Sequence, residues 1–118
     1  MSNVVSWSLQ MSVREGCLDD AKALVPEMVE GTRNEPGALT YEYYLSDDGG
    51  SCHIYERYTD SDAVMAHLGN FGANYAERFM ACFEPTSFSV YGPASDEVRG
   101  ALEGFGAAHF GSMGGFRR

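Results

Sequence analysis

The first part of the chain alternates apolar and small polar residues with a period of two. From Asn3 to Val13, the odd positions from Val5 onward are apolar, and the even positions between them are Ser or Gln. A period of two over this length predicts a β-strand. One side of this strand carries Trp7 and the other carries Ser8. The pattern leaves open which side faces inward, because a row of small uncharged side chains suits a cavity wall as well as solvent.

Further along the chain, stretches with helical spacing alternate with stretches rich in aromatic residues. The pattern predicts, in order, a helix at 16–32, strands at 38–45 and 52–58, helices at 62–69 and 73–82, a strand at 85–92 and a short helix from Ser95 to Glu103. Pro26 lies inside the first helix and predicts a kink or a late start there. Asp60 or Ser61 is the expected N-cap of the second helix, which we expect to break at Gly69–Gly72.

This β-α-β-β-α-β order predicts an α+β, ferredoxin-like fold in which a four-stranded antiparallel sheet carries its helices on one face. The other face would then expose side chains of the Trp7 or Tyr type. A second copy of the chain is expected to cover them, which predicts a homodimer. Residues 1–92 form this domain. Residues 93–118 add a helix and a tail rich in Gly and aromatic residues, either a flexible end or, as we favour, a strap over the dimer or a pocket.

Composition narrows the function classes. The 118 residues suit one domain, and the formal charge of −9 disfavours binding to nucleic acid or to an anionic membrane surface. The chain has no apolar run of membrane-spanning length and no secretion signal, so we expect a cytoplasmic protein. Cys17, Cys52 and Cys82 are widely spaced, which indicates reduced thiols and no metal site.

Short motifs between Glu35 and His67 carry a family resemblance. They are Glu35-Pro36-Gly37, Tyr41-Glu42, Tyr55-Glu56-Arg57-Tyr58 and Ala66-His67. Their order and spacing resemble the antibiotic biosynthesis monooxygenase family, whose members are dimeric α+β barrels. The resemblance covers roughly Val5 to Tyr91, and Tyr58 stands where the family commonly has Trp.

The resemblance implies a function. Several members of the family oxidise quinols or fused-ring phenols with molecular oxygen and without flavin, metal or haem. We therefore expect a cofactor-independent monooxygenase acting on a small aromatic polyphenol or quinol. A haem-degrading branch of the superfamily is disfavoured, because residues 71–75 lack the histidine that would bind the haem. His67 and Tyr58 are the catalytic candidates. The expected substrate-binding residues are Trp7, Ser8, Tyr41, Tyr43, Glu56, Phe71 and Tyr75.

Each candidate also has a structural interpretation. His67 is either a general base or a histidine that holds the helix to the strand beneath it. Tyr58 either orients a substrate hydroxyl or fills space, and Glu56 either binds a ring hydroxyl or pairs with a neighbouring group. The alternative for the whole protein is a non-catalytic dimer that binds a small hydrophobic metabolite, or a stress-associated domain.

Overall fold

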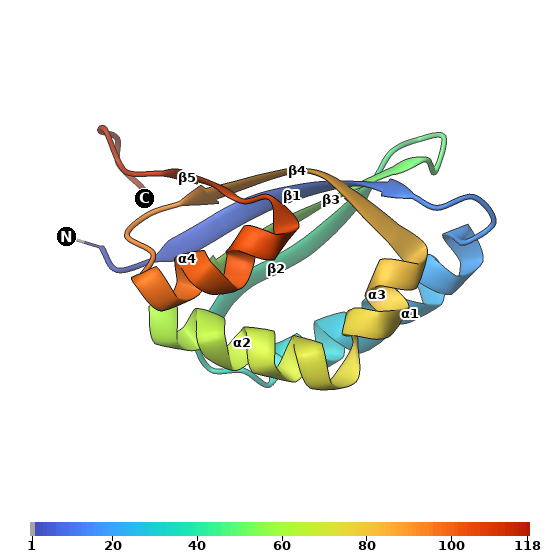
Figure 1. Ribbon diagram of the computed structural model, residues 1–118, viewed down its shortest axis with the longest axis horizontal. Coiled ribbons are helices and arrows are strands. Elements are labelled where there is room, and N and C mark those ends of the chain that lie inside the picture. Colours follow the sequence, from blue (N-terminus) through green and yellow to red (C-terminus); the bar gives the residue numbers. More distant parts are fainter. Residues whose placement is uncertain (1) are drawn as a thin grey trace.

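Strand β1 lies at the centre of a five-stranded sheet in the computed structural model, which describes residues 2–118 (Figure 1). In sheet order the strands are β2 (Ala38–Leu45), β3 (Ser51–Tyr58), β1 (Val5–Val13), β4 (Phe83–Tyr91) and β5 (Ala108–Phe110). The first four pair antiparallel, whereas β5 runs parallel to β4. The sheet is therefore mixed.

The prediction of four strands was wrong, because the C-terminal segment supplies a fifth. Gly106 takes a left-handed backbone conformation and turns the chain back toward the sheet. The amide of Gly92 then donates to the carbonyl of Phe110 at 2.9 Å. A strand of only three residues is too short to show an alternating pattern, so no local pattern predicts β5.

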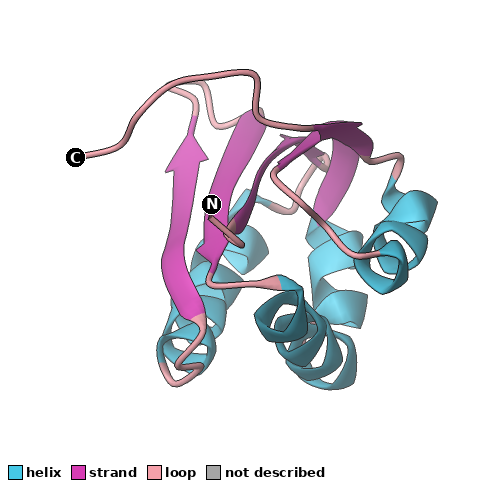
Figure 2. Cartoon of the chain, turned by 90° about the vertical axis from the view of Figure 1, so that its left-hand side faces the viewer, coloured by secondary structure: helices cyan, strands magenta, loops and turns pink. Residues whose placement is uncertain are grey.

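All the helices pack on one face of the sheet (Figures 1 and 2). They are α1 (Leu18–Arg33), α2 (Ser61–Asn74), α3 (Ala76–Cys82) and α4 (Asp96–Leu102), and a 3-10 turn (Glu103–Phe105) follows α4. Asp60 caps α2 by accepting a hydrogen bond from the amide of Ala63. α1 contains Pro26 but does not start late. The expected break of α2 at Gly69–Gly72 was also wrong, because the helix continues to Asn74.

The period of two in β1 separates two environments. Val5, Trp7, Leu9 and Met11 are buried on the side that the helices cover, which we call the covered face. Ser8 lies on the opposite side, which we call the open face. Trp7 was expected among the side chains exposed on the uncovered side of the sheet, and this expectation was wrong. The aromatic residues that the open face does expose include Tyr44, Tyr91 and Phe110.

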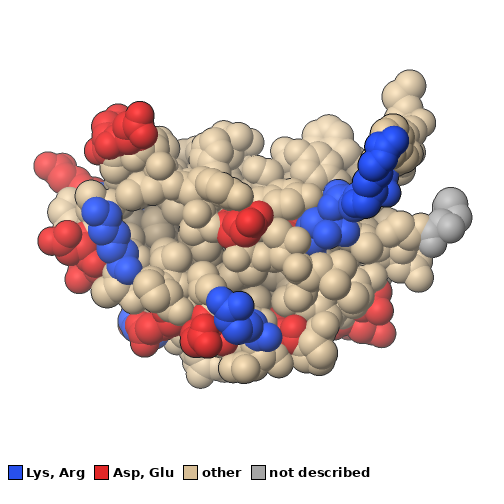
Figure 3. All heavy atoms as spheres, turned by 180° about the vertical axis from the view of Figure 1, so that it is seen from behind, with Lys and Arg blue, Asp and Glu red and all other residues tan. Residues whose placement is uncertain are grey.

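The charged side chains are unevenly placed on the surface. Figure 3 shows acidic groups spread over several parts of the viewed surface and a run of basic groups near the end that carries both termini. Arg57, Arg99 and Arg117 line a hollow there. No helix within residues 2–118 has the length and apolar character needed to cross a membrane.

Candidate functional site

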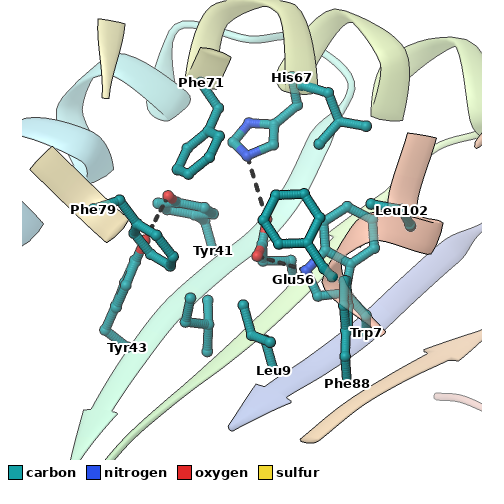
Figure 4. Close-up of a pocket in the computed structure, with 13 residues that line it drawn as sticks. Trp7, Leu9, Tyr41, Tyr43, Glu56, His67, Phe71, Phe79, Phe88 and Leu102 are labelled. Carbon is teal, nitrogen blue, oxygen red and sulfur yellow. Dashed lines mark hydrogen bonds and ion pairs between the residues drawn. The ribbon is translucent and has the colours of Figure 1, made fainter. Parts of the chain in front are cut away.

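Two neighbouring rows of residues across the sheet form the floor of a pocket. In one row Tyr41 lies opposite Glu56, and Glu56 lies opposite Trp7; in the next row Tyr43 lies opposite Ile54 and Ile54 opposite Leu9. The helices form the roof (Figure 4). The pocket is lined by Trp7, Leu9, Tyr41, Tyr43, Ile54, Glu56, His67, Leu68, Phe71, Phe79, Phe88, Leu102 and Phe105.

The free space in this pocket is small, about 40 Å³. A single water needs roughly 10 to 15 Å³ of such free space, so the pocket has room for only a few waters. Leu102 and Phe105, from the C-terminal segment, form part of the wall. A ring-sized ligand would require some of these wall side chains to move apart.

Glu56 is the polar centre of the covered face. It is 4% exposed, and it accepts hydrogen bonds from the indole N–H of Trp7 at 2.6 Å and from the hydroxyl of Tyr58 at 2.5 Å. Burial raises the pKa of its carboxyl, and the nearby His67 and the two hydrogen bonds offset this only in part. A carboxylate with a raised pKa is a stronger base than one in water, which suits proton transfer.

His67 lies between two carboxylates. Its Nε2 is 3.4 Å from Oε1 of Glu56, and its Nδ1 is 3.0 and 3.2 Å from the two carboxylate oxygens of Glu35. The ring itself is almost fully buried. Asn70, one turn further along α2, donates to Glu35 at 2.9 Å, and Asn74 donates to Asn70 at 2.7 Å. Helix α2 thus presents a continuous polar row to Glu35.

Glu35 reaches His67 because the turn after α1 packs tightly on the start of α2. The carbonyl of Gly37 accepts the amide of Thr59 at 3.0 Å. A Cβ atom placed on Gly37 would lie 2.5 Å from the Cβ of Ala63. Only glycine allows this approach, so the Glu35-Pro36-Gly37 motif places the carboxylate against α2.

Tyr41 and Tyr43 provide neutral hydroxyl groups in the same pocket. The two oxygens are 2.8 Å apart, and Tyr43 also contacts the sulfur of Met28 at 3.6 Å. Burial raises the pKa of both phenols, and the charge of Glu56 adds to this effect. Both hydroxyls therefore keep their protons at neutral pH and can donate hydrogen bonds to an anion in the pocket.

The structure gathers most of the residues predicted for the site. Trp7, Tyr41, Tyr43, Glu56, His67 and Phe71 all line the pocket. Tyr58 does not line it, but its hydroxyl holds Glu56. Ser8 lies on the open face, and Tyr75 sits at the end of α2, where its hydroxyl contacts the carbonyl of Glu27 at 3.4 Å. Within residues 2–118, no group of three or more His, Cys, Asp or Glu side chains forms a candidate metal site.

Sequence reasoning missed several parts of the site. In the sequence Glu35 stands out only as part of the Glu35-Pro36-Gly37 turn, although its charge beside that turn is a signal that it can reach a neighbouring element. The other missed residues fall within the predicted helices, strand and tail; they are Phe79, Phe88, Leu102 and Phe105. No local pattern marks them as pocket residues, because only the packing of α3, β4 and the C-terminal segment brings them together.

Comparison with known proteins places this arrangement in a family. Residues 6–81 match the model of the family described as antibiotic biosynthesis monooxygenase. The chain is 39% identical over 70 residues to the "Putative monooxygenase Rv0793" of Mycobacterium tuberculosis, a match that covers 59% of this chain and 69% of that protein.

The fold of this chain is also similar to those of solved structures. MupZ from Pseudomonas fluorescens superposes with a TM-score of 0.88 at 26% identity, covering 100% of this chain and 91% of that chain. SnoaB from Streptomyces nogalater, described as a cofactor-independent oxygenase, superposes with a TM-score of 0.67 at 16% identity, covering 80% of this chain and 96% of that one. At this low identity, the second likeness shows the fold.

Proposed function

Because the chain belongs to the antibiotic biosynthesis monooxygenase family, we propose that it is a monooxygenase that oxidises a small aromatic polyphenol or quinol with molecular oxygen and without a cofactor. One observation carries the proposal: a buried carboxylate, Glu56, lies at the centre of a pocket walled by aromatic rings. The oxygenase name of SnoaB supports the idea that this fold can host such chemistry.

The pocket suits a flat, electron-rich ring. The rings of Phe71 and Phe79 meet edge to face at 5.1 Å, and those of Trp7 and Phe88 do so at 5.7 Å. Aromatic walls of this kind bind rings through offset and edge-to-face contacts. A substrate held among them would have its hydroxyl close to Glu56, Tyr41 or Tyr43.

The proposed reaction begins with proton transfer from the substrate hydroxyl to the Glu56 carboxylate. The phenolate is stabilised by hydrogen bonds from Tyr41 and Tyr43, and it passes an electron to oxygen. A carbon–oxygen bond then forms, and the O–O bond breaks. One oxygen atom stays in the quinone product, and the other leaves as water with the hydrogens of the substrate C–H and O–H bonds. The substrate supplies all the electrons, so atoms and electrons balance.

The remaining residues have supporting roles in this proposal. Glu56 exchanges the proton with the substrate, and His67 balances its charge. Tyr58 is a positioning residue, because its hydroxyl donates to Glu56 and its ring lies 5.1 Å from those of both Trp7 and His67. Residues 93–118 would act as a strap, since Leu102 and Phe105 close one wall of the pocket.

We also propose that the protein is a homodimer whose open faces meet. The open face exposes aromatic rings, and the ring centroids of Tyr91 and Phe110 lie 5.9 Å apart without cover from a helix. Exposed aromatic patches commonly mark association surfaces. The catalytic pocket lies on the covered face, so dimerisation would leave it accessible.

Oxygen uptake tests the proposed reaction. Hydroquinones, naphthols and anthrones would be offered to the purified protein in the presence of a chelator, with heat-inactivated protein as the blank. We expect saturable uptake, reduced by about 10²- to 10⁴-fold in Glu56→Gln because the proton acceptor is lost.

Glu42→Gln is the matched control. Glu42 lies on the neighbouring strand but is exposed on the open face. The oxygen-uptake rate of this variant should therefore stay within about twofold of the wild-type rate. Uptake abolished by the chelator would contradict the cofactor-free reaction. If no substrate raises uptake above the blank but one binds tightly to the folded protein, the protein is the non-catalytic binding module instead.

A further inference from the structure

The buried site continues from Glu56 through His67 to a second carboxylate that reaches the surface. The side chain of Glu35 is 16% exposed, against 5% for His67 and 6% for Glu56. The ring of His67 bridges the two carboxylates through its two nitrogens. Within residues 2–118, His67 is the one group with a cationic form that pairs with Glu56.

The protonation states of Glu35, His67 and Glu56 depend on one another. A neutral imidazole carries one N–H, so it can donate to only one of its two carboxylate neighbours. Its unprotonated ring nitrogen would then face the oxygens of the other carboxylate. Both contacts are favourable only if the ring is doubly protonated, or if one carboxyl carries the extra proton. Glu35 lies against Nδ1, and Glu56 lies against Nε2.

We infer that Glu35 is a positioning residue that keeps His67 doubly protonated, so that Glu56 faces the substrate as an ionised base. This inference rests on the proposed function, in which Glu56 accepts the substrate proton. Asn70 holds Glu35 in place by its hydrogen bond at 2.9 Å. The other titratable groups around the His67 ring are Tyr41 and Tyr58, whose ring centroids lie 5.5 and 5.1 Å from it.

Neither tyrosine can replace Glu35 in this role. Burial raises the pKa of Tyr41 and Tyr58, so both are neutral at pH 7. Removing the Glu35 charge would leave Glu56 alone to hold the second proton on the ring. The ring would then carry its second proton less often, so Glu56 would lose the cationic partner that favours its ionised form.

The first test uses the resting protein without substrate. Glu35→Gln keeps an amide oxygen that can accept the Nδ1–H, but it removes the charge. NMR of protein labelled with ¹⁵N-histidine shows which ring nitrogens carry protons, and His67→Asn identifies the His67 signals among those of the three histidines. At pH 7 we expect a doubly protonated ring in the wild type and in the control Glu30→Gln. In Glu35→Gln this form should fall at least about tenfold relative to the neutral ring.

The second test follows oxygen uptake. Glu35→Gln should lower kcat about tenfold or more, leave KM nearly unchanged and shift the pH profile, whereas Glu35→Asp should restore most of the rate. A structural role alone would be satisfied by Gln and would not move the pH profile. If Glu35→Gln does not fold, Asn70→Ala replaces it. This variant frees Glu35 from its anchor and should reduce the doubly protonated form to a smaller extent.

The outcomes separate this inference from the proposed function. Identical His67 signals in the wild type and Glu35→Gln would overturn the role of Glu35, whatever the activity. If the signals change as expected but no substrate is oxidised, Glu35 controls the protonation of His67 and the monooxygenase proposal fails. If oxidation occurs and Glu35→Gln matches the wild-type kcat and pH profile, the reaction stands and Glu35 is not needed for it.

Discussion

On strand β3, Glu56 and Tyr58 point to the covered face and are buried, whereas Tyr55 and Arg57 alternate with them and point to the open face. The same backbone therefore supplies one row of side chains to an enclosed site and the next row to a surface. On the covered face, the carboxyl of Glu56 has partners at both of its oxygens. On the open face, Nε of Arg57 is buried without a partner among the described residues.

The comparison shows where chemistry can take place on this fold. Burial beneath the helices raises the pKa of Glu56, Tyr41 and Tyr43 and places these groups within one pocket. The polar groups of the open face include Glu42 and Tyr44, which are exposed to solvent. The covered face therefore suits proton transfer, and the open face suits association.

The largest expected effect comes from removing one aromatic ring from each face. Phe88 is buried on the covered face beside Trp7 and Phe105, and Phe110 is half-exposed on the open face. Phe88→Ala should lower the free energy of unfolding by about 3 to 5 kcal/mol, because it opens a cavity in the core. Phe110→Ala should cost less than about 1 kcal/mol in dilute protein. Urea unfolding measures both.

Phe110→Ala also tests the homodimer. If open faces meet, light scattering should give twice the chain mass of 12.9 kDa for the wild type and a lower average mass for the variant. A loss of stability as large as that of Phe88→Ala at every protein concentration would contradict the placement of Phe110 on an exposed face.

A smaller effect is expected where the covered face meets the turn that carries Glu35. Gly37→Ala places a methyl group against Ala63. We therefore expect the free energy of unfolding to fall by about 1 to 3 kcal/mol and Glu35 to be displaced. Gly69→Ala is the control, because its position in α2 is exposed and open. That variant should gain about 0.5 to 1 kcal/mol from helix propensity. Equal effects of the two substitutions would show that the turn does not pack tightly on α2.

Two glycines in α2 also show what the sequence could and could not predict. Strong local patterns predicted β1 to β4 and their order along the chain, because the period of two is set by the backbone itself, but they did not predict β5. Gly69 and Gly72 suggested a break in α2 that does not occur. Packing outweighs the propensity of a single glycine, and Val64 and His67 hold the helix on the sheet.

The site was harder to predict than the fold. The motifs between Glu35 and His67 supplied most of its polar residues, because residues on neighbouring strands meet at regular positions. The pattern of β1 could not say that Trp7 points inward and Ser8 outward, since both sides suit a covered or an open environment. Leu102 and Phe105 depend on where α4 packs, and no local rule in the sequence determines that.

The smallest expected effect is the pH dependence of stability that the Glu56 carboxyl contributes. Its pKa is raised above the ordinary value of 4.5, so the folded protein holds this proton at a pH where the unfolded chain has lost it. The contribution of the protonated Glu56 carboxyl to the free energy of unfolding is therefore fully present below about pH 4.5. It is lost as the pH rises through the folded-state pKa. Its slope cannot exceed about 1.4 kcal/mol per pH unit, the limit for one proton.

Glu56→Gln removes this titration and keeps the shape of the side chain. Between pH 4.5 and 7, the wild type should lose stability relative to the variant, as measured by urea unfolding at several pH values. Glu42→Gln on the open face should follow the wild type, because Glu42 is exposed to solvent. Parallel curves for the wild type and Glu56→Gln would mean that His67 and the hydrogen bonds from Trp7 and Tyr58 fully compensate for the burial of Glu56. The covered face would then differ from the open face in packing but not in its acid–base chemistry.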